Sequence, residues 1–281
     1  MRLAPCARRK PSHKPASATM SEAQPRRRHH HQNPLAKALH FIQLARRLVA
    51  GNIMLIFVVV GLGLNIWIFA EVAGEVYEGE TQAFDNFVLK MFRDANDPAN
   101  AAGPQWLANA ARDITALGSI AVLMLVTFVV LGYLAFRRQW AWAGLVALAS
   151  FGGAILTWAL KGLFQRARPD VVPHLDVVTS YSFPSGHAMI SAVVYITLGA
   201  MLARVATERR VKLYFLSIAL VLAGLVGLSR VYVGVHYPTD VVAGWSAGMI
   251  WAAMCWLLAT WLERRSRMHG QRLSEEKQQA G

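Results

Sequence analysis

The chain is poor in charged residues and almost free of cysteine. Asp, Glu, Lys and Arg make up 16% of its 281 residues, whereas soluble domains usually carry about 25%. Because 55% of the residues are hydrophobic, an ordinary soluble domain is excluded and an integral membrane protein is favoured. The only cysteines are Cys6, in a polar segment, and Cys255, inside an apolar run, so we expect neither a disulfide framework nor a thiol nucleophile.

Acidic residues are nearly missing from the first 49 positions, where eleven Lys and Arg stand against one acid, Glu22. This segment carries +10 of the formal net charge of +13, which leaves +3 for the rest. A basic tail before an apolar run orients a membrane protein and favours anionic headgroups. Nucleic-acid binding would need a folded basic face with reading elements, which the sequence does not offer. We predict that residues 1–36 form a disordered basic tail, with membrane lipids and no nucleic acid as partners.

Long apolar runs are abundant. A helix needs about 20 residues to cross a hydrocarbon core of about 30 Å. Six apolar stretches meet or approach this length, at about 50–70, 114–136, 140–160, 188–204, 212–230 and 241–262. We therefore predict an all-α fold: an integral membrane bundle of six helices within residues 37–268, followed by a polar tail at 269–281.

The basic clusters between these stretches predict the orientation of the bundle. With six spans, the clusters at 46–47, 137–138, 204–212 and 264–267 all fall on one side. Both termini are then cytoplasmic, and we expect the membrane to be a bacterial inner membrane. The segments that face outward are 71–113, 161–187 and 231–240. Four cations break this rule and require a functional explanation: Lys161, Arg166, Arg168 and Arg230.

A short helix is predicted within the first outward segment, in "FDNFVLKMF" at 84–92. Its apolar residues, Phe84, Phe87, Val88, Met91 and Phe92, recur at three- and four-residue steps. This face either lies in the membrane interface or packs against the bundle. Neither interpretation assigns chemistry to the helix.

Polar residues cluster where three other segments reach the outer side. The segments are "KGLFQRARP" at 161–169, "PSGH" at 184–187 and "SRVYVGVHYPTD" at 229–240. They supply Lys161, Arg168, Ser185, Gly186, His187, Ser229, Arg230, His236 and Asp240. Each residue alone has a structural interpretation, such as a snorkelling cation, a helix cap or a hydrogen-bonded histidine. Their co-occurrence at one depth of an apolar chain favours a functional site, since ionisable groups there are costly.

Three cations at one depth indicate an anionic ligand. The fork of an Arg suits phosphate oxygens, and a Lys adds a point charge. Ser185 and Gly186 stand where the fourth span begins, so free backbone N–H groups there can add donors. Asp240 follows His236 by four residues, about one helical turn. A carboxylate at that distance can fix the imidazole tautomer, which makes His236 the expected nucleophile and His187 the expected acid.

A metal site is the competing interpretation. It would take His187, His236, Asp240 and His174 as zinc ligands. Three neighbouring cations would repel Zn²⁺, so we expect no metal and no cofactor.

The three segments resemble the type 2 phosphatidic acid phosphatase (PAP2) superfamily, whose phosphate pocket is shared with vanadium haloperoxidases. Its pattern is Lys, six residues, Arg-Pro; then Pro-Ser-Gly-His; then Ser-Arg, five residues, His, three residues, Asp. All three parts match in order, and the resemblance spans roughly 80–262, including "DITALGS" at 113–119 and "DVVAGWSAG" at 240–248.

The resemblance implies a metal-independent lipid phosphatase built as a six-helix membrane bundle. Lys161, Arg168 and Arg230 would hold the phosphoryl oxygens with Ser185 and Gly186. His236 would form a phosphohistidine, Asp240 would orient it, and His187 would protonate the leaving group and then activate water. The substrate would be a lipid phosphate or an isoprenoid pyrophosphate, such as phosphatidic acid, phosphatidylglycerophosphate or undecaprenyl pyrophosphate.

Two other functions stay open from the residues alone. A lipid phosphotransferase would use the same phosphohistidine with an acceptor other than water. A non-enzymatic lipid-phosphate binder or transporter would need the cations but not the paired histidines and carboxylate.

Overall fold

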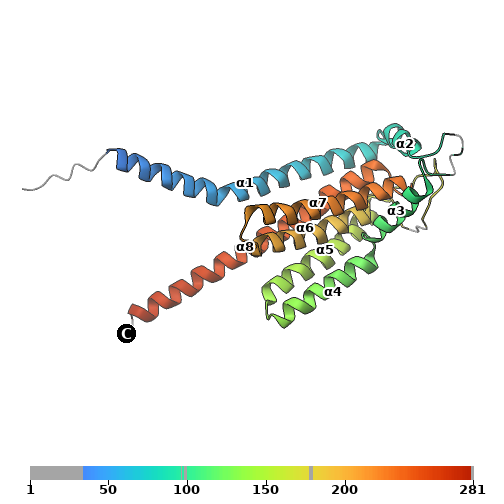
Figure 1. The fold of residues 1–281 in the computed structure, drawn as a ribbon. Coiled ribbons are helices and arrows are strands. Elements are labelled where there is room, and N and C mark those ends of the chain that lie inside the picture. The colour runs from blue at the N-terminus through green and yellow to red at the C-terminus, as the bar shows by residue number, and fades with distance from the viewer. Residues whose placement is uncertain (1–33, 96, 98–99, 177–179, 280–281) are drawn as a thin grey trace, which may run out of the picture. The chain divides into compact units, whose positions relative to one another are not determined.

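The computed structural model describes residues 34–95, 97, 100–176 and 180–279, and over these residues the fold is all-helical, as predicted (Figure 1). The helix bundle lies within one compact unit that begins at residue 52. Most of the predicted tail at 1–36 lies outside the described residues. The helices are α1 (Pro34–Glu78), α2 (Gln82–Met91), α3 (Gln105–Ala116), α4 (Ile120–Phe136), α5 (Trp140–Phe164), α6 (Gly186–Val205), α7 (Arg209–Tyr232) and α8 (Pro238–Gln279).

The described residues contain five candidate membrane spans, or six if the bent pair α3 and α4 crosses as one. Five are single helices: Ile56–Glu78 of α1, then α5, α6, α7, and Pro238–Glu263 of α8. The sixth is the pair α3 and α4, which meet at an angle of 45°. These spans make the chain an integral membrane protein, in agreement with the six-helix prediction.

The predicted continuous helix at 114–136 is wrong at residues 117–119, where α3 ends and α4 begins. Gly118 lies at this break, and a Cβ added there would approach Val226 Cγ1 to 2.3 Å. Ser119 caps α4 by accepting a hydrogen bond from the Val122 N–H at 3.3 Å. The break thus combines a close approach of α7 with a good N-cap, which apolar periodicity does not reveal.

The first predicted span, at 50–70, lies within α1, which continues to Glu78. The described part of α1 that is long and apolar enough to cross a membrane is Ile56–Glu78. Glu71, Glu75 and Glu78 belong to α1 and are exposed, so they do not open a loop. Their four- and three-residue spacing places them on one side of the helix, which leaves the opposite side to Ala73, Phe69 and Val76 in the core.

Helix α6 packs against α5, α7 and α8. Small residues allow the close approach of α8: a Cβ added at Gly244 would lie 2.7 Å from the Ser185 carbonyl oxygen, and one at Gly248 would lie 2.6 Å from that of Met189. Since successive spans run in opposite directions, the C-terminal ends of α5 and α7 meet the N-terminal ends of α6 and α8. Helices α2 and α3 lie at the same end of the bundle (Figure 1).

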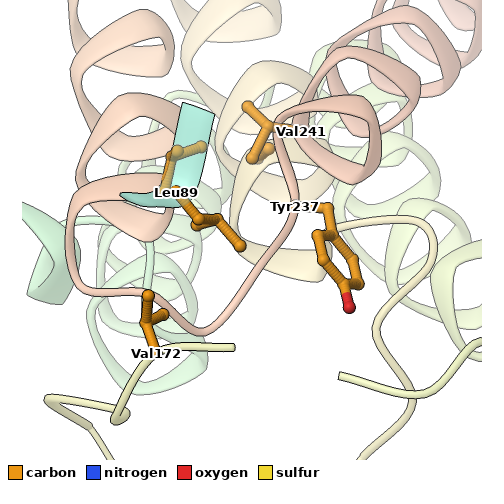
Figure 2. Packing of buried hydrophobic residues seen from close by; sticks show 6 residues of the cluster. Leu89, Val172, Tyr237 and Val241 are labelled. Carbon is orange, nitrogen blue, oxygen red and sulfur yellow. The ribbon is translucent and has the colours of Figure 1, made fainter. Parts of the chain in front are cut away.

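The predicted short helix at 84–92 is confirmed as α2. Phe84, Phe87 and Met91 are exposed, whereas Asp85 and Leu89 are buried. Val88 and Phe92 of the predicted apolar face are partly buried and pack against the core. Leu89 packs with Val172, Tyr237 and Val241, in the cluster that Figure 2 shows.

Candidate active site

The predicted site residues come from four helix ends and two connecting segments. Lys161 is in the last turn of α5, Arg230 in the last turn of α7, and Asp240 in the first turn of α8. Ser185 is the N-cap of α6, followed by Gly186 and His187. Arg168 and His236 lie in the segments before α6 and before α8. The alternating direction of the spans is what brings these ends together.

His236 and Asp240 are paired through the imidazole Nδ1, which lies 3.4 Å from Asp240 Oδ2. Both residues are buried, with exposed fractions of 1% and 0%. Asp240 Oδ2 also accepts the Tyr237 N–H at 2.9 Å and the Ser182 hydroxyl. A carboxylate with these donors needs a proton on Nδ1, so the lone pair of His236 is on Nε2.

The Nε2 atom of His236 faces Arg168, whose Nη1 lies 3.3 Å away. Burial lowers the pKa of His236 to about 3, against the opposing effect of Asp240, and Arg168 and Arg230 lower it further. The imidazole is therefore neutral near pH 7 and its Nε2 lone pair is unprotonated. A neutral imidazole next to a cation is suited to attack an anion bound by that cation.

Arg168 is held by backbone oxygens. Its Nε donates to the Ser180 carbonyl at 2.7 Å and its Nη1 to the Val235 carbonyl at 2.6 Å. Burial, then the positive charge of Arg230, lowers the pKa of Arg168 to about 10, so the side chain stays charged. Lys161 donates to the carbonyls of Tyr181 and Ser182, the latter at 3.5 Å.

Arg230 is 1% exposed, and its Nη1 donates to Asp176 Oδ2 at 2.8 Å. Its Nε has no hydrogen-bond partner among the described residues, and neither has the buried Ser185 Oγ. Two buried donors without partners are costly unless a ligand uses them. A phosphate oxygen is suited to accept from both kinds of donor.

The start of α6 differs in one respect from the prediction. The Ser185 N–H donates to the Asp240 carbonyl at 2.9 Å, so this amide is not available to an anion, although the hydroxyl is. Gly186 keeps its predicted proximity to the site: a Cβ there would lie 3.5 Å from Lys161 Cε and 3.3 Å from Thr157 Cγ2. His187 lies against Gly118 and within electrostatic range of Arg230, Arg168 and Lys161.

The structure separates His174 from the residues of the competing metal interpretation. Its Nε2 is 2.6 Å from the Pro169 carbonyl oxygen. Among the described residues, no three His, Cys, Asp or Glu side chains are grouped in a way that would hold a metal ion. Ser229, the other polar residue of the cluster, bonds to the Thr115 hydroxyl at 2.6 Å and donates to the Val226 carbonyl at 2.7 Å.

Three residues near the site had no role in the sequence prediction. Ser182 donates to Asp240, and Arg166 joins Asp240 to Asp85 of α2. Arg166 had a signal, because it was one of the cations on the wrong side of the membrane. Asp85 and Ser182 had none, since both depend on long-range packing.

The turn that carries His236 is clamped by Arg93. Its Nη1 donates to the Tyr232 carbonyl at 2.9 Å, and its Nη2 to the carbonyls of Val233 and Pro173 at 3.3 and 3.1 Å. Burial lowers the pKa of Arg93. Gly234 makes this possible: it has a φ of +82°, and a Cβ there would lie 2.1 Å from Arg93 Nη2.

Comparison with known proteins gives matches over the region that carries this site. A sequence model of the PAP2 superfamily matches residues 140–264. Phosphatidylglycerophosphatase B from Bacillus subtilis (strain 168) is 34% identical over 186 residues, which cover 65% of this chain and 86% of that protein. Decaprenylphosphoryl-5-phosphoribose phosphatase from Mycobacterium tuberculosis (strain ATCC 25618 / H37Rv) is 36% identical over 115 residues, or 40% of this chain and 56% of that protein.

A solved structure is similar over most of its length. The crystal structure of a transmembrane PAP2 type phosphatidylglycerolphosphate phosphatase from Bacillus subtilis superposes with a TM-score of 0.62 at 29% identity. The match covers 73% of this chain and 96% of that chain.

Proposed function

Because this chain belongs to the PAP2 superfamily and is a membrane lipid phosphatase, we propose that it hydrolyses a lipid phosphomonoester of the phosphatidylglycerophosphate class through a phosphohistidine at His236. The observation that carries the mechanism is the geometry of His236. Its Nδ1 is bonded to Asp240, and its Nε2 is unprotonated and faces Arg168.

The cations and the start of α6 bind the phosphate. Lys161, Arg168 and Arg230 bind the phosphoryl oxygens, joined by the Ser185 hydroxyl and the backbone around Gly186. The unpartnered Arg230 Nε and Ser185 Oγ support this role, since a bound phosphate satisfies both.

The reaction has two steps. In the first, His236 Nε2 attacks phosphorus, the bond between phosphorus and the lipid oxygen breaks, and His187 gives its proton to the leaving alkoxide. Asp240 stabilises the cationic phosphoimidazole that forms. In the second, His187 takes a proton from water, whose oxygen attacks phosphorus and breaks the P–N bond. Inorganic phosphate leaves and His236 is restored.

The membrane explains how a lipid substrate reaches this pocket. The site lies where the spans begin and end, so the acyl chains can stay in the hydrocarbon layer while the phosphate enters. We place this end on the periplasmic side of a bacterial inner membrane, with both termini cytoplasmic, because the basic clusters 137–138 and 204–212 lie at the other end of the spans.

The substrate class rests on the extent of similarity. The match to phosphatidylglycerophosphatase B covers 86% of that enzyme, and the match to the decaprenylphosphoryl-5-phosphoribose phosphatase covers 56%. Both are phosphatases, which favours water over another phosphoryl acceptor and a catalyst over a passive binder.

The test is phosphate release by the purified protein in detergent. The panel contains phosphatidylglycerophosphate, phosphatidic acid, undecaprenyl pyrophosphate and a lipid A phosphate, each with and without EDTA. We expect the first lipid to be hydrolysed fastest, EDTA to have no effect, and His236→Ala to abolish turnover.

The intermediate is tested by rapid quenching with labelled substrate. We expect a phosphoenzyme that is stable to alkali and labile to acid, as a P–N bond is, and absent from His236→Ala. Turnover by His236→Ala would refute the nucleophile, and preference for the pyrophosphate would refute the substrate class.

A further inference from the structure

Asp85 is a fully buried carboxylate on α2, a helix outside the three segments that supply the candidate site. Its Oδ2 accepts from Arg166 Nη2 at 2.7 Å and from the Thr239 hydroxyl at 2.7 Å. Its Oδ1 accepts the Thr239 N–H at 3.2 Å. Both oxygens therefore bind groups next to Asp240, although Asp85 itself lies more than 150 positions away in sequence.

Arg166 connects Asp85 to the proposed catalytic pair. Its Nη1 donates to Asp240 Oδ1 at 2.7 Å, and its Nη2 to Asp85 Oδ2. The same two nitrogens also donate to the hydroxyls of Thr239, at 2.9 Å, and Thr81, at 3.1 Å. The guanidinium lies over the Tyr237 ring, 4.2 Å from its centroid. With both terminal nitrogens occupied by carboxylates, Arg166 is not a phosphate ligand, unlike Arg168 two residues later.

The bond to Arg166 decides which oxygen of Asp240 faces the imidazole. Oδ1 is held by Arg166, so Oδ2 is left for His236 Nδ1, the Tyr237 N–H and Ser182. Without this contact the carboxylate can rotate, and the imidazole loses its fixed tautomer and direction. Small displacements of a catalytic group can cost about 100-fold in rate.

One cation, Arg166, lies between two carboxylates. Burial disfavours the charged form of Arg166, but the carboxylates of Asp240 and Asp85 outweigh it and raise its pKa above the ordinary value. Removing Arg166 leaves two buried carboxylates without the cation they share, which is costly in a site excluded from water. Three ions placed this way hold a defined geometry, beyond what apolar packing of α2 through Leu89 requires.

We infer that Asp85 and Arg166 are positioning residues for catalysis: through Arg166, α2 fixes the Asp240 carboxylate and thereby aims His236 Nε2 at phosphorus. This inference rests on the proposed roles of His236 and Asp240. It assigns α2 a function in the reaction, although none of its residues is proposed to touch the substrate.

The test uses Arg166→Gln, Arg166→Lys and Asp85→Asn, each in the full chain in detergent. We expect kcat to fall by about 10- to 100-fold in Arg166→Gln, in line with a displaced catalytic group. Arg166→Lys should recover part of the loss, because an ammonium can still bridge two carboxylates. Asp85→Asn keeps the shape of the side chain, and its kcat should lie between those of Arg166→Gln and Arg166→Lys.

Two readouts separate positioning from binding and from folding. The dissociation constant of inorganic phosphate, measured by calorimetry, should stay within about threefold of the unmodified protein, since Arg166 does not bind phosphate. In an Asp240→Asn background, Arg166→Gln should cost far less than it does alone, because residues that act through one another are not additive. Lys90→Gln removes an exposed charge from α2 and serves as the matched control, with kcat unchanged.

Several results would overturn the inference. They are a kcat of Arg166→Gln within threefold of the unmodified protein, a parallel loss of phosphate affinity, or full additivity with Asp240→Asn. Failure of all three variants to elute as folded protein would also overturn it, in favour of a purely structural role. Turnover by His236→Ala would instead remove the proposed mechanism on which the inference rests, so the two failures are distinguishable.

Discussion

At the scale of single residues, Asp176 competes with the proposed phosphate for Arg230. Its Nη1 is bound to the half-exposed carboxylate of Asp176, while its Nε is unpartnered and available to phosphate. If Arg230 binds phosphate as proposed, the carboxylate of Asp176 competes with the substrate for its charge.

We predict that Asp176→Asn lowers KM by about two- to fivefold, the range expected from losing one partly exposed ion pair. The value of kcat should change less than KM, because Asp176 contacts Arg230, a proposed phosphate ligand. Initial rates over a range of lipid concentrations check this, with Asp170→Asn, an exposed acid of the same segment, as the control. A higher KM would show that Asp176 helps to hold Arg230 in place.

His236 gives a prediction about stability and pH. Burial lowers its pKa to about 3 in the folded chain, and the unfolded chain has an ordinary value of about 6.5. Between these values the unfolded state binds more protons than the folded state, so stability falls as the pH falls from about 6.5 towards 3. The His236→Asn variant has no titrating imidazole at this position, so its stability should fall less over the same pH range.

The measurement compares the Tm of the two proteins in detergent at pH 7 and pH 5. We expect the unmodified protein to lose more Tm than His236→Asn over this interval. Equal losses would mean that the imidazole does not stay neutral in the folded chain.

The grouping of the candidate site residues at one end of the bundle could be predicted from sequence, because each stands in a short local pattern. The spacing of His236 and Asp240 within one turn already indicated their pairing, and Lys161 and Arg168 stand in one segment. Asp85 and Ser182 could not be predicted, because their roles depend on which helix end packs beside Asp240. Arg166 lies between these cases: its charge on the outer side was an anomaly, but its partners were not visible.

At the scale of helices, the contact between α6 and α8 determines the position of the pocket. Gly244 of α8 lies directly against the carbonyl of Ser185. Ser185 is the residue immediately before α6, the helix that carries His187. A larger residue there has to push the start of α6 away from Asp240. Packing and catalysis are therefore coupled at this position.

We predict that Gly244→Ala lowers the free energy of unfolding by about 1–3 kcal/mol, as overpacked cores do, and that it also lowers kcat. Gly224→Ala is the matched control, because a Cβ there meets no atom within 4 Å. Alanine favours helix over glycine, so the control should be neutral or slightly more stable. Thermal unfolding and phosphate release of the two variants check this, and equal stability would contradict the close contact.

The middle part of each helix could be predicted from sequence, but the residues at which the helices begin and end could not. The apolar runs identified all six spans, yet the break at Gly118 and the continuation of α1 through Glu71–Glu78 escaped prediction. Both depend on neighbours: Gly118 on α7, and the glutamates on the exposed side of a helix whose other side is packed. Hydropathy averages over such details.

At the scale of the whole molecule, the arrangement of charges predicts which end of the bundle faces outward. The test replaces Cys6 and Cys255 and introduces one cysteine by Asp170→Cys or Glu208→Cys, both at exposed positions. An impermeant thiol reagent applied to intact cells should label residue 170 and not residue 208. Both should react after permeabilisation, and labelling of 208 alone in intact cells would reverse the orientation.

The two unpartnered donors at Arg230 and Ser185 also have a consequence for the end of the reaction cycle. If these donors bind the phosphate of a lipid as proposed, they also bind free inorganic phosphate by the same contacts. The lipid product can diffuse away within the bilayer, whereas phosphate has to leave into water from a site with three cations. We therefore expect product inhibition, and with it a dependence of lipid turnover on the phosphate content of the surrounding medium.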